Sequence, residues 1–172
     1  MPNFDLSPMV ERLRQAYWDK RAGADIGFLG IKAANVDNPE VTIDEETVDQ
    51  YVPGIVIRAD DVSFTGSIAR TYEGSASFYV IFSRFVDSDE ESEKTMLQAL
   101  GALANAFLPD PEDADTSDYV FPNWRVQDSL DHGYSPLDLT NVEFAVDPII
   151  EGYKDRRVEH GAVIFTLLLH TT

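Results

Sequence analysis

Apolar residues follow a helical period in two segments of the chain, which predicts two main helices. The first helix is expected over residues 8 to about 20, because Ser7 supplies a capping side chain and Pro8 fits the first turn. The second is expected to follow the capping box of Ser88 and Glu91 and to end at the next proline. Its predicted apolar face comprises Met96, Leu97, Leu100, Leu103, Ala104 and Phe107.

Runs of β-branched and aromatic residues predict strands in the middle of the chain. Three strands are expected at Ile55–Ala59, Val62–Tyr72 and Ser75–Val86. Between them, Asp60-Asp61 and Glu73-Gly74 have the composition of tight turns. Strands that follow one another so closely predict antiparallel pairing.

The last third of the chain is also expected to be mainly β. Strands are predicted near Trp124–Gln127, at Val142–Val146 and at Val158–His170, and Lys154–Arg157 is expected to connect the last two. Residues 162–169 are almost continuously apolar, which is typical of a strand that is covered on both faces.

Residues 23–54 show little periodicity, and we expect one short helix near Glu45. Together the elements predict an α+β fold, in which an antiparallel or mixed β-sheet packs against two main α-helices. No repeat or low-complexity linker divides the chain, so we expect a single domain over residues 1–172. An apolar patch that is broken by glycines consists of Ile26, Phe28, Leu29 and Ile31.

The charge of the chain is unusual for a soluble domain. It has 31 Asp and Glu against 13 Lys and Arg, which leaves a net charge of −18. This excess is typical of adaptation to concentrated salt. At roughly 1 M ionic strength the Debye length is about 3 Å, so repulsion between surface carboxylates is largely screened. The same charge disfavours binding to nucleic acid through a general basic surface.

Several classes of function are disfavoured by missing residues and motifs. The chain has no cysteine, which excludes disulfides, thiolate zinc sites and cysteine nucleophiles. It has no glycine-rich phosphate-binding motif and no GxSxG motif. No segment has the ~18 apolar residues needed to cross a bilayer and no signal peptide is expected, so we predict no membrane partner. The acidic loop at residues 109–118 lacks the glycine of an EF-hand, and we expect no metal and no cofactor.

Few polar side chains suggest chemistry. Residues 128–132 hold two aspartates, a serine and a histidine, but the members of a catalytic triad normally converge from separate elements. We interpret this run as a polar loop, and we expect no catalytic residue. His160 and His170 lack an identifiable third ligand, which favours positions at the surface or at the edge of the core.

Positive charge is concentrated in two short stretches, on the first helix and before the last strand. One interpretation is two ordinary solvated faces. The other is a self-complementary surface, in which basic patches of one subunit meet acidic patches of the next and successive contacts close a ring. The basic residues are Arg12, Arg14, Lys20, Arg21, Lys154, Arg156 and Arg157. The candidate contact residues are Arg12, Arg14, Ile26, Phe28, Leu29, Ile31, Lys154, Arg156 and Arg157.

The order of elements, with a long strand that leads directly into a capped helix (SASFYVIFSRFVDSDEESEKTMLQALGALANAF) and a final strand pair, resembles the tail terminator or tail completion proteins of long-tailed viruses. The resemblance implies a structural protein without a catalytic site, which forms a hexameric ring that ends the tail tube and receives the neck of the filled head. It implies tail tube and neck or connector proteins as partners, and a channel through which genomic DNA passes without specific binding. It also implies a place in the virion, and in the host cytoplasm during assembly.

Two other interpretations remain open. In the same class, the chain is another neck or tail component, such as a head-to-tail adaptor or a tail tube subunit. In a different class, it is a small cytoplasmic binding protein or enzyme of a salt-adapted cell. A closed apolar pocket with converging polar side chains would favour the second interpretation.

Overall fold

The computed structural model of the chain describes residues 6–32, 44–66, 72–86, 92–106, 139–153 and 156–171. Four antiparallel strands form one sheet in the order β1-β2-β4-β3, and helices pack against it. The expected α+β class is confirmed, and the sheet is antiparallel. In chain order the elements are α1 (Ser7–Lys20), η1 (Gly27–Leu29), α3 (Val48–Tyr51), β1 (Gly54–Gly66), β2 (Tyr72–Phe85), α4 (Ser92–Asn105), β3 (Leu139–Tyr153) and β4 (Arg156–Thr171).

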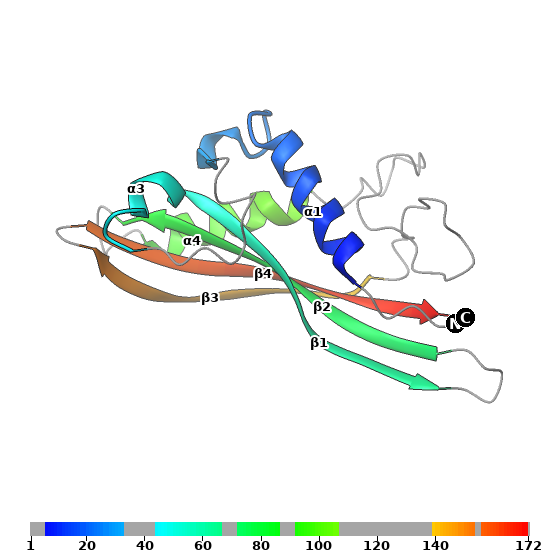
Figure 1. Cartoon of the computed structure of the whole chain (residues 1–172). Helices are drawn as coiled ribbons and strands as arrows, with labels where there is room; N and C mark the ends of the chain where they lie inside the picture. Colours follow the sequence, from blue (N-terminus) through cyan, green and yellow to red (C-terminus); the bar gives the residue numbers. More distant parts are fainter. Residues whose placement is uncertain are drawn as a thin grey trace.

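The sheet is long and strongly twisted, so that β1 crosses in front of β2 in Figure 1. One of its faces carries α4, because a Cβ added at Gly161 of β4 would lie 2.6 Å from Sδ of Met96. Side chains alternate along a strand, so Val163, Phe165 and Leu167 share the face of Gly161, and all three are buried. The main core therefore lies between this face of the sheet and the helices α1 and α4.

The structure confirms the two predicted helices but changes one of their ends. Ser7 is the first residue of α1 and not its cap, and the preceding Leu6 makes no side-chain capping bond. Proline is present in the first turn of α1 as predicted. The capping box predicted at Ser88 and Glu91 lies outside the described residues.

The apolar face of α4 is confirmed except at one residue. Met96, Leu100 and Leu103 are fully buried, but 40% of Leu97 is exposed. At 3.6 residues per turn, Leu97 lies about 100° around the helix from Met96, at the rim of the apolar stripe. The prediction that Leu97 is buried was therefore wrong. Phe107 lies outside the described residues.

The two turns predicted in the middle of the chain are wrong, because both dipeptides lie within strands. Asp60 and Asp61 belong to β1, at a shift in its register with β2, and Asp61 has a left-handed backbone with φ 50°. A β-bulge of this kind inserts a residue without ending the strand. A single strand therefore replaces the predicted Ile55–Ala59 strand and the first part of Val62–Tyr72.

Gly74 allows β1 and β2 to approach each other closely, and it does not form a turn. It pairs with Phe64, beside the β-bulge. A Cβ at this position would lie 1.9 Å from the carbonyl oxygen of Ser63. Glycine in a sequence indicates either a turn or a close backbone contact. Only the pairing of the two strands distinguishes these cases.

The hairpin of β3 and β4 is longer than predicted. The predicted strand Val142–Val146 is confirmed as part of β3. Arg156 and Arg157 belong to β4 and pair with β3, so they do not form the predicted connection. Cross-strand pairing extends to Tyr153 and Arg156. The strand predicted near Trp124–Gln127 lies outside the described residues.

The two faces of β4 differ in burial. Leu167 is buried on the face that carries α4, whereas 39% of the adjacent Leu168 is exposed on the other face. The prediction that this run is covered on both faces is therefore wrong at Leu168, although Ala162 on the same face is buried. At the opposite end of the sheet, Val48 and Val52 of the α3 region pack against Val158 on the face away from α4. The α3 helix matches the short helix expected near residue 45.

Candidate subunit-contact surfaces

The apolar patch predicted as a contact surface is mostly part of the core. Ile26, Leu29 and Ile31 are buried in the cluster that joins α1, α4 and the sheet. Phe28 on η1 is 69% exposed. Gly30 ends this turn with a left-handed backbone of φ 66°. Of the four predicted residues, Phe28 alone therefore offers a large apolar surface to a partner.

Arg14 and Lys20 of α1 make contacts within the chain. Arg14 pairs with Glu11 one turn earlier, and the hydrogen bond from Arg14 lowers the pKa of the Glu11 carboxyl. The Lys20 ammonium donates to the carbonyl of Ala106 at 2.7 Å, just beyond the end of α4, where the helix dipole favours a cation. The side chain of Arg12 lies outside the described part of the structure. Part of the predicted basic surface thus makes contacts within the folded chain itself.

Arg156 connects three elements at the start of β4. Its guanidinium pairs with the Asp49 carboxylate of α3 and lies 3.5 Å from the ring centroid of Phe85 on β2. Both charged groups are largely exposed, so this ion pair contributes little to stability. Arg157 is exposed, and Lys154 lies outside the described residues.

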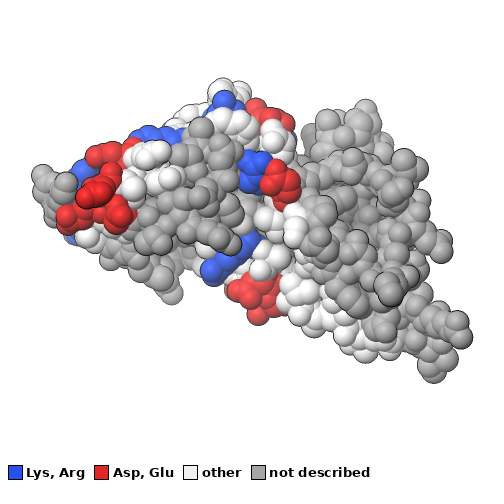
Figure 2. Space-filling view, in the orientation of Figure 1, with Lys and Arg blue, Asp and Glu red and all other residues white. Residues whose placement is uncertain are grey.

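Acidic side chains gather around α3, where Figure 2 shows them beside basic groups at one end of the molecule. Asp44 accepts hydrogen bonds from the Thr47 hydroxyl and from two backbone N–H groups, and these bonds lower its pKa. Because Arg156 pairs with this segment, charges of both signs meet here. The exposed acids of the segment are Asp44, Glu45, Glu46 and Asp49.

A buried ion pair links β2 and β4, and we did not expect it from the sequence. Arg84 binds Glu159, whose side chain is fully buried on the face that carries α4. Loss of the Arg84 charge would remove an ion-pair partner from the buried Glu159, and breaking a buried ion pair costs about 3–5 kcal/mol. Arg84 and Glu159 are each a single charge within an otherwise mainly apolar run (YVIFSRFV and VEHGAV). This pattern was the signal in the sequence that could have indicated a buried ion pair.

His160 projects from the other face of the sheet. Its Nδ1 lies 2.7 Å from Oγ of the buried Ser83. A partly buried imidazole that is held by a hydroxyl fits the predicted position at the edge of the core. The side chain of His170 and the whole run 128–132 lie outside the described residues.

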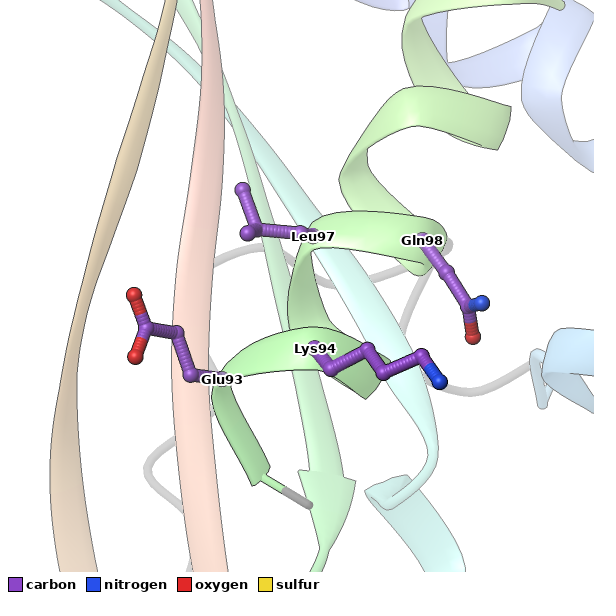
Figure 3. Close-up of a pocket in the computed structure, with 4 residues that line it drawn as sticks. All are labelled: Glu93, Lys94, Leu97 and Gln98. Carbon is purple, nitrogen blue, oxygen red and sulfur yellow. The ribbon is translucent and has the colours of Figure 1, made fainter.

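Two hollows on the surface of the described residues are open to solvent. One follows the first turns of α4, where Glu93 and Leu97 point to one side and Lys94 and Gln98 to the other (Figure 3). All four side chains are exposed. The second hollow lies between α1 and β1. Neither is the closed apolar pocket that would favour a small-molecule site.

The described part of the chain contains no group of three or more His, Asp or Glu residues that could hold a metal ion. Across the same ranges, no helix has the length and apolar character needed to span a membrane. No model of a known protein family matches the chain, and no curated protein matches it.

Proposed function

We propose that this protein is a structural virion protein that forms a ring at the end of the tail tube of a long-tailed virus and joins it to the neck of the head. The ring is built from copies of this chain, six in the family that the sequence resembles. Its partners are tail tube and neck or connector proteins, and it has no catalytic role. It belongs to the virion, and to the host cytoplasm during assembly.

The two long edge strands carry this proposal. β1 has 13 residues and β3 has 15 residues, and within the described ranges no strand pairs with the outer edge of either. An unpaired edge is a template for pairing with another chain, and monomeric proteins commonly shorten or cover such edges. Two long edges that no described strand covers suit head-to-tail assembly, which closes into a ring when the rotation between copies allows it.

The net charge of −18 supports the proposed passage of DNA. Carboxylates that line a channel repel the phosphates of the duplex, so DNA slides through without binding. The same excess of acids suits a particle that assembles in concentrated salt, where repulsion between neighbouring subunits is screened.

The mass of the purified protein in molar salt, measured by light scattering, tests the proposal together with electron micrographs. We expect a closed ring of several copies. A tail tube subunit would instead form tubes, which the micrographs distinguish from rings. A protein that is monomeric at every salt and concentration, and that binds or converts a small metabolite, would contradict the proposal in favour of a cytoplasmic binding protein or enzyme.

Phe28 and Arg157 provide a second test of the predicted contacts. Phe28→Ser and Arg157→Glu should weaken ring formation or attachment to partner proteins and leave the monomer folded, because both side chains are exposed. Molar salt should reduce the effect of Arg157→Glu more than that of Phe28→Ser. Leu29 is unsuitable because it is buried, and reversal at Arg156 would also break its pair with Asp49. Unchanged assembly and attachment of both variants would remove these residues from the contact surface.

A further inference from the structure

Arg58 and Glu143 lie at opposite edges of the sheet but in the same row, where a row is the set of four residues that are paired across the four strands. Arg58 of β1 pairs with Tyr79, Tyr79 pairs with Ile164, and Ile164 pairs with Glu143 of β3. Directly paired residues project from the same face of a sheet. Both charged side chains therefore project from the face opposite α4, and both are exposed.

The adjacent rows are equally regular. On β1 the register with β2 shifts only after Asp60, and on β3 the register with β4 shifts on both sides of the run 141–145. Each outer edge therefore presents a regular segment that spans the same five rows. The other four rows join Val56 to Ala145, Ile57 to Phe144, Ala59 to Val142 and Asp60 to Asn141.

The backbone groups of these two edges are also compatible. In an antiparallel sheet, each residue directs its N–H and C=O to one side, and the direction alternates along the strand. Across a row, the pairs of neighbouring residues alternate between hydrogen-bonded and non-hydrogen-bonded. In a sheet of four strands, the two residues at the ends of a row therefore direct their N–H and C=O groups in matching ways: both away from the sheet, or both toward their neighbours within it. β1 and β3 run in opposite directions. A second copy in the same orientation would thus add its β1 antiparallel to β3 with matching hydrogen bonds.

Phe144 and the hollow beside β1 complement each other in shape and polarity. Phe144 projects from the face that carries α4 and is 39% exposed. The side chains of Arg58 and Ala59 project from opposite faces of the sheet. A hollow that both side chains line therefore reaches around the outer edge of β1. With the rows aligned, Phe144 of one copy is diagonal to Ala59 of the next, within reach of an aromatic ring. The apolar residues that line the hollow are Leu6, Val10, Ala59 and Val62.

We infer that copies of this chain join through their sheets, with the β3 edge of one copy paired to the β1 edge of the next, Phe144 in the hollow and Glu143 beside Arg58. This inference rests on the proposed ring assembly and identifies its contact. Pairing of β3 with β3 is disfavoured, because residues 139–153 contain three acids and no basic residue. The contact is therefore head to tail and continues from copy to copy.

Two variants that each alter one edge test this contact. Phe144→Asp changes the β3 edge, and Val62→Asp changes the β1 edge at a side chain that is 43% exposed. Each variant alone should stay monomeric at concentrations where the unaltered protein assembles, with an affinity at least about tenfold lower. Mixed in equal amounts, the two should form a dimer, because the intact β1 edge of the first meets the intact β3 edge of the second. Leu168→Asp, at a residue that is also 39% exposed but lies on the inner strand β4, is the matched control and should assemble.

Charge reversal tests the same contact independently. Glu143→Arg should weaken assembly, and Arg58→Glu in the same chain should restore it. Circular dichroism checks that each variant is folded. Two results would contradict this contact but not the proposed ring, provided that the unaltered protein forms rings. In the first, each edge variant alone also assembles. In the second, the folded edge variants stay monomeric when mixed. If the unaltered protein never assembles, the proposed function fails, and the contact with it.

Discussion

Tyr17 shows how the fold alters the chemistry of a single residue. Its side chain is fully buried, and its hydroxyl donates to the carbonyl of Leu103 at 2.8 Å, which ties α1 to α4. Burial raises the pKa of the Tyr17 phenol well above its ordinary value, because the phenolate would lose its contact with water. The helical period places Tyr17 on the apolar face, but it does not identify the partner of the hydroxyl.

The raised pKa of Tyr17 predicts a loss of stability at alkaline pH. Above about pH 10 the unfolded chain releases the phenol proton and the folded chain keeps it, so ionisation favours the unfolded state. Tyr17→Phe should remove this part of the alkaline loss, and at neutral pH it should cost about 1 kcal/mol for the lost hydrogen bond. The free energy of unfolding in urea, measured from neutral pH to about pH 11, tests both effects. Equal alkaline losses in the two proteins would contradict the argument.

Leu100 and Leu97 are two leucines of the same helix, α4, that differ in burial. Leu100 is fully buried, so Leu100→Ala should lower the free energy of unfolding by about 2–5 kcal/mol through lost burial and the cavity left behind. Leu97 is 40% exposed, and the same change there should cost clearly less. Chemical denaturation measures both values. Similar costs at the two positions would show that the wrong face of α4 is assigned to the core.

At the scale of elements, the pairing of β1 with β2 depends on one glycine. Gly74 faces the β-bulge of β1, where the backbone of Ser63 occupies the space of a Cβ. The bulge and the glycine together keep two long strands paired through a strong twist. This pairing also presents the regular β1 edge from which the proposed contact is built.

Gly74→Ala should therefore destabilise the protein. The added Cβ would lie 1.9 Å from a backbone oxygen, which cannot move like the end of a flexible side chain, so we expect a cost of about 1–3 kcal/mol. Gly152→Ala on β3 is the control, because a Cβ there would meet no atom within 4 Å. Thermal unfolding of both variants measures the difference. If the two variants melt at the same temperature, close packing at Gly74 is not what holds these strands together.

At the scale of the whole molecule, the dominant property is the net charge of −18. The described ion pairs neutralise only a few of the acids. The remaining acids repel one another in the folded state, and in the proposed assembly neighbouring copies would also repel one another. Salt should thus act on both folding and assembly.

The melting temperature should fall as salt is reduced from molar concentration to about 0.05 M. Over this range the Debye length rises from about 3 Å to more than 10 Å, so screening of the repulsion is lost. Scanning calorimetry across the series measures the effect, and neutral sucrose at matched osmolarity serves as the control. A melting temperature that stays constant across the salt series would remove the interpretation as a salt-adapted protein.

Local patterns predicted the elements whose signal lies within one segment. The helical stripes predicted α1 and α4, and alternation predicted the strand at Val142–Val146. The same reasoning misplaced Asp60-Asp61 and Gly74, because a bulge and a close contact share their residue types with turns. For the candidate contact surface, the sequence pattern grouped Phe28 with three apolar residues that are buried in the structure.

The sequence by itself determined the α+β class, the two main helices and the acid excess, because helical period, strand composition and charge are properties of neighbouring residues or of the whole composition. Only the tertiary structure decided which residues share a row. The pairs Arg84–Glu159 and Arg156–Asp49 each join residues far apart in the chain. The alignment of Arg58 with Glu143 depends on the registers of three strand pairs: β1 with β2, β2 with β4, and β4 with β3. Register depends on the packing of whole strands, so no local pattern contains it.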